Sequence, residues 1–138
     1  MAEFGATGPL AAEIASAQQS ESAEHLLLGN GIAISPGEVS LDFDISLDFP
    51  LVTLVSMIAP SPDWFVGVSG LALFDGSDWV DSLVIELYPY DAGTDSGTDY
   101  ASPNEATNPP GDIAPINSGP LWVNGVLPPI GTFTFVRQ

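Results

Sequence analysis

Residues 65–88 read FVGVSGLALFDGSDWVDSLVIELY, and this stretch decides the fold. It holds two runs with strand character, 65–74 and 79–88, separated by the turn Asp75-Gly76-Ser77-Asp78. Aspartate, glycine and serine are favoured in tight turns, and a short polar turn between two apolar runs is typical of consecutive strands. The stretch therefore predicts two strands of a mainly β, antiparallel structure.

Segments on both sides extend this pattern. Leu51 to Ala59 is a nearly continuous apolar run, which favours a strand covered on both faces, and Thr132 to Val136 alternates as a final strand. Residues 94–120 are rich in Gly, Pro, Ser, Asn and Asp and are expected to form a long loop. Many short strands with Gly and Pro turns predict an antiparallel β-sandwich with a helical region at its margin.

Residues 39–49 alternate strictly between apolar and polar side chains. The apolar residues occupy the odd positions: Val39, Leu41, Phe43, Ile45, Leu47 and Phe49. The even positions include three aspartates: Asp42, Asp44 and Asp48. This period of two predicts a strand with one buried and one wet face. Residues spaced by two along a strand lie about 7 Å apart, so a solvated face is favoured over a metal site for the aspartates.

The N-terminal part has a different character. Pro9 to Leu28 predicts a helix, or two short ones, because Pro9 suits a first helical turn and the run Gly29-Asn30-Gly31 is a strong stop. His25 near the predicted end is interpreted as a surface or capping residue that favours the helix dipole when protonated. The length predicts a single domain, 1–138, with a divergent helical part at 1–31 and a β-sandwich at 32–138.

Composition excludes several functional classes. The chain has no cysteine and no lysine, one arginine, one histidine and a formal net charge of -17, which speaks against a catalytic triad, a zinc site and nucleic-acid binding. No apolar run is long enough for a transmembrane segment, and the first residues lack the order of a signal peptide, so the start fits either a processed or a truncated end. An acidic protein without basic partners is expected to be stabilised by bound cations or by salt.

Residues 91–97, DAGTDSG, place two carboxylates around a glycine turn. Asp91 and Asp95 can face one ion because glycine permits the bend between them, and Asp63 can reach the same end of a sandwich. Calcium takes six to eight oxygen ligands from carboxylates, backbone carbonyls and water. The loop is not an EF-hand, since its twelfth position is Ser102 in place of glutamate. Turn-forming aspartates without a metal are the alternative interpretation.

Four ordered segments carry a family resemblance: APSPDWFVGV at 59–68, WV at 79–80, LYPYDAGTDSG at 87–97 and YASPN at 100–104. Together they closely resemble the spondin domain, a module that is also found in bacterial secreted proteins. The similarity is best over residues 56–115.

This resemblance implies a C2-domain-like β-sandwich, a role in the extracellular matrix or in cell adhesion, and one structural calcium ion at one end of the sandwich. Carried over by position, the calcium ligands are Asp63, Asp91 and Asp95, completed by backbone or water oxygens. Animal members carry cysteines and basic residues that this chain lacks, so integrin or heparin-like binding is not transferred. The match is poor before Ile32, and a missing edge strand would invite self-assembly by strand exchange.

Two other functions fit parts of the sequence. A carbohydrate-binding module could stack sugars on exposed aromatic side chains, although core packing explains the same residues: Trp64, Trp79, Tyr100 and Trp122. A glycoside hydrolase would need two carboxylates, for which Asp63 and Glu86 are candidates, but Glu86 on an alternating strand is expected to face water. The favoured prediction is a non-enzymatic, secreted or cell-surface calcium-binding module of the adhesion or matrix type, with an unknown protein or glycan partner.

Overall fold

The computed structural model describes all of residues 1–138. It is mainly β, with antiparallel sheets and one helix, which confirms the predicted class. Two compact units are present, residues 1–6 with 51–138 and residues 7–50, and each is described by itself. The predicted single domain with a division at residue 31, and the C2-like packing of the sheets, stay predictions.

The unit of residues 7–50 holds the helix, α1 (Gly8–Gln19), which starts with Pro9 in its first turn as predicted. The helix ends well before Leu28 because two serines donate to the Ala17 carbonyl. Ser20 donates through its hydroxyl at 3.0 Å, and Ser22 donates through its N–H at 2.8 Å. His25 lies beyond the helix, so a role at the helix dipole is wrong, but its side chain is exposed as predicted. The structure contains no helix with the length and apolarity of a membrane span.

The strand predicted at residues 39–49 is wrong. No strand or bridge includes the segment, and near its end Phe49 N–H donates to the Ser46 carbonyl at 3.2 Å in a turn. Apolar side chains of the alternating pattern are exposed, among them Val39, Leu41 and Leu47. Alternation indicates which face a strand would bury, but a strand also needs a neighbouring strand to pair with, and no strand of the structure pairs with this segment.

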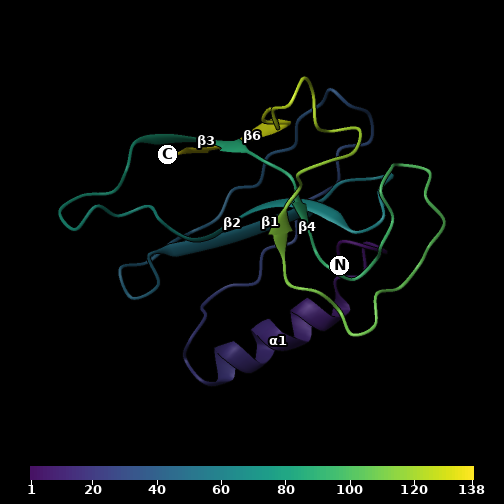
Figure 1. Cartoon of the computed structure of the whole chain (residues 1–138). Helices are drawn as coiled ribbons and strands as arrows, with labels where there is room; N and C mark the ends of the chain where they lie inside the picture. Colours follow the sequence, from purple (N-terminus) through teal and green to yellow (C-terminus); the bar gives the residue numbers. More distant parts are fainter. The chain divides into compact units, whose positions relative to one another are not determined.

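The larger sheet belongs to the other unit (Figure 1). It has four antiparallel strands in the order β1-β2-β4-β5, namely β1 (Leu51–Met57), β2 (Trp64–Ala72), β4 (Tyr90–Asp91) and β5 (Ala114–Pro115). The positions predicted for β1 and β2 are confirmed within two residues, and β5 is a short strand inside the predicted long loop. The prediction that β1 is covered on both faces is wrong, because Leu51 and Leu54 are exposed. The β2–β4 pairing is short and places Trp64 opposite Asp91.

A second sheet pairs β3 (Ser82–Leu87) with β6 (Gly131–Val136). The turn at residues 75–78 is confirmed, since Asp75 N–H donates to the Asp78 carbonyl at 3.0 Å and Phe74 bridges Trp79. The two strands that flank this turn nevertheless belong to different sheets, because β2 pairs with β1 and β3 pairs with β6. Residues 65–88 therefore connect the two sheets.

The best-buried apolar residues are Ala2, Trp64, Val66, Leu73, Leu87 and Ile116. Trp64 and Val66 lie at the start of β2, and Leu87 ends β3. Two carboxylates are equally buried: Asp63 has no exposed surface, and Asp95 is 4% exposed. Buried carboxylates without a basic partner are rare in proteins. The start of β2, which Asp63 immediately precedes, is therefore a candidate location for a functional site.

Candidate metal centre

Asp63 and Asp91 are brought together by the pairing of β2 with β4. Asp63 immediately precedes β2, and Asp91 ends β4 opposite Trp64. Ala92 N–H also donates to the Asp63 carbonyl at 3.3 Å, which ties the two chain segments at this point. Two carboxylates that are 28 positions apart in sequence thus become neighbours in space.

The Asp63 side chain organises the turn that follows Asp91. Its Oδ2 atom accepts from the Thr94 N–H at 2.6 Å, the Thr94 hydroxyl at 3.1 Å and the Asp95 N–H at 3.0 Å. Three donors on one carboxylate oxygen fix the turn against the start of β2. Thr94 was not singled out from the sequence, because a threonine in a Gly-rich turn carries no signal of such a contact.

The other oxygen of Asp63 has no partner. Oδ1 is buried and accepts no hydrogen bond. A buried carboxylate oxygen without a donor or a cation is costly, so native proteins usually satisfy it. Among the three aspartates, this atom is the strongest structural indication of a missing positive charge.

Asp91 responds to the same crowding of negative charge. Burial is the main cause that raises the pKa of its carboxyl above the usual 3.8, and the charges of Asp63 and Asp95 raise it further. The Gly93 N–H, which donates to Asp91 Oδ1 at 2.7 Å, opposes this shift. The charges of Asp63 and Asp95 therefore disfavour the ionised form of Asp91.

Asp95 is held from both sides by the loop around it. Its Oδ1 accepts from the Gly97 N–H at 2.7 Å, and its Oδ2 accepts from the Glu105 N–H at 3.1 Å. Asp95 also forms a bridge with Ala106. The long loop predicted at 94–120 is thus folded back on the carboxylate cluster.

The glycines of the 91–97 turn are required by close contacts. Gly93 has φ +73°, and a Cβ atom there would lie 2.6 Å from the Gly111 carbonyl oxygen. Gly111 N–H donates to the Gly93 carbonyl at 2.7 Å. A Cβ at Gly97 would lie 2.6 Å from Pro62 Cγ. Larger residues would push the loops apart and separate Asp63 from the turn.

The side chains do not already form a closed metal cage, since the structure contains no group of three or more His, Cys, Asp or Glu side chains that could hold a metal ion. Basic residues do not compensate the cluster either. The ion pairs of the structure join His25 to Glu24, and Arg137 to Asp78 and Asp81. The donor set still fits a hard cation, because it consists of carboxylate oxygens, one of them unsatisfied.

The aromatic candidates divide into packed and exposed residues. Trp64 is 3% exposed and packs edge to face on Tyr100, with 5.5 Å between the ring centroids, so core packing explains it. Trp79 is half-buried and packs on Phe74, with 5.3 Å between the ring centroids. Tyr100 and Trp122 are exposed. Only these last two keep the surface that stacking on a sugar requires.

Glu86 is exposed, as predicted, and accepts a hydrogen bond from the Tyr88 hydroxyl at 2.9 Å. Both residues line a groove of about 480 Å³ along residues 67–72 of β2.

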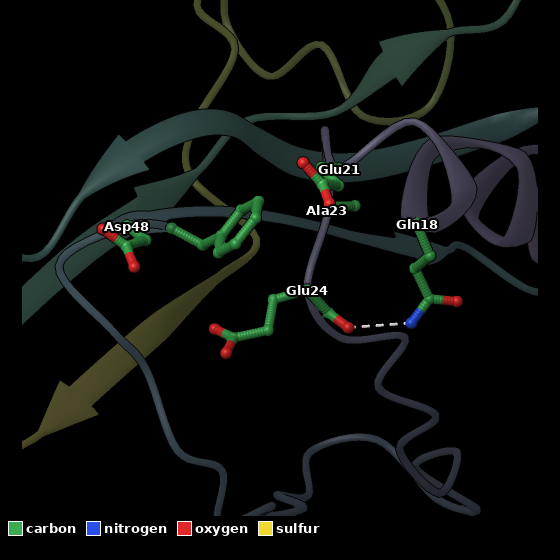
Figure 2. A pocket seen from close by; sticks show the side chains of 6 residues that line it. Gln18, Glu21, Ala23, Glu24 and Asp48 are labelled. Carbon is green, nitrogen blue, oxygen red and sulfur yellow. Dashed lines mark hydrogen bonds between the residues drawn. The ribbon is translucent and has the colours of Figure 1, made fainter.

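A hollow of about 550 Å³ lies within the unit of residues 7–50 (Figure 2). It is lined by Gln18, Glu21, Ala23, Glu24, Asp48 and Phe49. Gln18 Nε2 donates to the Glu24 carbonyl at 2.7 Å, and Ser46 Oγ donates to Glu24 Oε2 at 2.8 Å. Its three acidic residues, Glu21, Glu24 and Asp48, are all exposed.

Comparison with known proteins agrees with the motifs around the centre. The Spondin_N family model matches residues 1–121, so the chain belongs to the spondin family. Human Spondin-2 is 38% identical over 146 residues, which cover 99% of this chain, and Gallus gallus Spondin-1 is 42% identical over 80 residues, which cover 57% of it. These spondin relatives are secreted proteins of the extracellular matrix.

The relatives are longer than the chain. The matched region covers 44% of human Spondin-2 and 10% of Gallus gallus Spondin-1. Rat Spondin-2 is 37% identical over 146 residues, and the matched region covers 44% of its length. The chain therefore spans less than half of these relatives, and the similarity concerns one module of them.

Proposed function

We propose that the chain is a non-catalytic extracellular module of the adhesion or matrix type, stabilised by one calcium ion at the Asp63, Asp91 and Asp95 centre. The observation that carries the calcium proposal is Asp63 Oδ1, a fully buried carboxylate oxygen without a donor. The raised pKa of Asp91, caused by burial and by its two acidic neighbours, supports it independently.

Calcium is favoured over other metals by the donor chemistry. All of the candidate side-chain ligands are carboxylates, and the chain has no cysteine. Hard oxygen donors suit calcium, whose flexible coordination accepts backbone carbonyls and water beside a small number of carboxylates. Bound there, calcium would supply positive charge to the cluster, while the residues themselves hold the 91–97 turn against the start of β2.

The extracellular setting follows from family membership and suits this metal. The chain shares the spondin module with secreted matrix proteins. Extracellular modules bind calcium with dissociation constants of about 0.1 to 1 mM, a range that external calcium fills. A module of this kind works by presenting a fixed surface to a protein or glycan partner.

The test is thermal and chemical unfolding in 10 mM calcium and in chelator. Mass action predicts that calcium raises the free energy of unfolding by about 1.4 to 2.7 kcal/mol for these affinities. Asp91→Asn should remove most of this gain, because it removes a charge from the centre. The control Asp75→Asn, in an exposed turn, should retain the gain in full. Equal unfolding curves for the natural chain in calcium and in chelator would refute the calcium proposal.

A carbohydrate-binding role remains the second candidate, supported by the exposure of Tyr100 and Trp122. Their substitution by alanine should abolish binding on a glycan array if they stack on sugars, without affecting the calcium response. Binding that survives both substitutions would place any glycan elsewhere, and hydrolytic turnover of a glycan would contradict the non-catalytic proposal.

A further inference from the structure

Asn104 connects the carboxylate centre to residues 1–6. With its amide oriented to satisfy its neighbours, the Asn104 nitrogen donates to Asp95 Oδ2 at 3.1 Å and to Glu3 Oε1 at 2.9 Å. One NH₂ group thus holds two carboxylates from segments that are far apart in sequence. The Glu105 N–H donates to the same Asp95 oxygen, so this side of Asp95 is fully used.

Residues 1–6 pack within the same compact unit as the sheets. Ala2 is 9% exposed, and Gly5 N–H donates to the Met1 carbonyl at 2.8 Å, which folds the segment into a turn. A Cβ atom at Gly5 would lie 3.1 Å from Met57 Sδ at the end of β1. The segment therefore has its own apolar contacts, and Glu3 adds the polar connection to Asn104.

This connection adds a fourth carboxylate to an already acidic region. Glu3 and Asp95 each have an oxygen within 3.1 Å of one amide nitrogen, and Asp95 in turn raises the pKa of Asp91 through its charge. Without positive charge, repulsion opposes the docking of Glu3. With positive charge at the centre, the same docking becomes favourable.

We propose that Asn104 and Glu3 are positioning residues of the metal centre, which couple cation binding at Asp95 to the docking of residues 1–6. This inference rests on the proposed calcium function. Groups in the second layer around a metal orient its ligands, and their loss commonly weakens metal binding by 10- to 100-fold. Coupling is reciprocal, so calcium must favour the docked segment as much as the docked segment favours calcium.

Calorimetric titration with calcium is the first arm of the test, on the full chain. Asn104→Ala should weaken calcium binding by about 10-fold or more, since Asp95 loses a donor that fixes its orientation. Glu3→Ala should weaken it less, by about 3- to 10-fold, because it acts through Asn104. The control Glu13→Gln, an exposed glutamate of α1, should leave affinity unchanged. Near-ultraviolet circular dichroism checks that each variant is folded.

Cleavage after Phe4 is the second arm, which a merely structural role would not affect. Phe4 is 73% exposed, so chymotrypsin can reach it, but cleavage requires residues 1–6 to leave their docked turn. Calcium should slow this cleavage in the natural chain by about fivefold or more, and mass spectrometry gives the rate. In Asn104→Ala the rate should be the same in calcium and in chelator.

The outcomes separate the two proposals. If the natural chain binds calcium, but Asn104→Ala and Glu3→Ala bind it equally well, the positioning role is overturned and the calcium function stands. Calcium-independent cleavage after Phe4 in a natural chain that binds calcium overturns the coupling in the same way. If the natural chain does not bind calcium in the titration, both proposals fall.

Discussion

Two aspartate–glycine turns of this molecule behave in opposite ways. In the turn of residues 75–78, Asp75 Oδ1 accepts from the Ser77 N–H, the Ser77 hydroxyl and the Asp78 N–H, each at 2.8 Å. These bonds, first of all that from Asp78, lower the pKa of the exposed Asp75 carboxyl. In the turn of residues 91–97, burial and neighbouring charge raise the pKa of Asp91.

The difference comes from what the fold places beside each turn. The exposed turn lies near the chain's only arginine, since Arg137 donates to Asp78 at 3.2 Å. The buried turn receives a second acidic segment instead, when β2 pairs with β4 and brings Asp63 beside it. An aspartate turn satisfies itself when it is alone in water. The same local chemistry forms the proposed calcium site where tertiary structure adds a buried carboxylate with an unused oxygen.

The largest expected effect comes from the glycines of the two turns. Gly93→Ala should lower the free energy of unfolding by about 4 kcal/mol, because positive φ and overlap with the Gly111 carbonyl add together. Gly76→Ala should cost only about 1 to 2 kcal/mol, since a Cβ at φ +101° there meets nothing within 4 Å. Urea unfolding in chelator measures both. Similar losses for both variants would mean that the loops at Gly93 and Gly111 can separate freely.

The next effect concerns the aspartates that organise each turn. Asp63→Ala in chelator should cost about 3 kcal/mol or more, because it leaves the Thr94 N–H, the Thr94 hydroxyl and the Asp95 N–H without an acceptor. Asp75→Ala should cost much less, since water replaces the carboxylate in an exposed turn. Amide hydrogen exchange at Thr94 and Ser77 checks each turn separately. Protection at Thr94 that survives Asp63→Ala would contradict the organising role of Asp63.

Sequence patterns predicted the parts of the fold that depend on local chemistry. The turn at Asp75 to Asp78 and the strands β1 and β6 follow from turn residues and apolar patterns, and the structure confirms them. The prediction of a strand at residues 39–49 failed because no strand of the fold pairs with this alternating segment. The pairing of β2 and β3 with different partners also depends on long-range contacts that a short pattern does not contain.

The candidate centre was predicted only in part for the same reason. Asp63, Asp91 and Asp95 carried a signal in their spacing and in the spondin-like motifs, and the fold does bring Asp63 to the turn that they form. Their role as calcium ligands stays a prediction. Asn104 belonged to one of those motifs, but nothing in the sequence indicates that its amide joins Asp95 to Glu3. Such contacts between distant segments require the folded chain.

The smallest expected effect is a difference in pH dependence between the two turns. Asp91 has a folded-state pKa above 3.8, so the folded chain binds its proton more tightly than the unfolded chain. In chelator, the contribution of Asp91 to the free energy of unfolding should therefore fall as pH rises through 3.8 toward the higher folded pKa. Asp91→Asn removes this fall, so the variant should gain stability relative to the natural chain between pH 3 and pH 7.

Asp75 should show the opposite sign. The folded-state pKa of Asp75 lies below 3.8. Its contribution to the free energy of unfolding is therefore present above pH 3.8 and is lost as pH falls through the folded pKa. Asp75→Asn should therefore lose stability relative to the natural chain over the same rise from pH 3 to pH 7. Unfolding curves of the natural chain, Asp91→Asn and Asp75→Asn in chelator, recorded from pH 3 to pH 7, measure how the free energy of unfolding of each protein changes with pH. Adding calcium should reverse the sign for Asp91→Asn alone, because the cation makes the ionised carboxylate favourable at the buried turn and leaves the exposed turn unaffected. If both variants kept the same sign in calcium and in chelator, the contrast between the two turns would be one of burial, without a cation site.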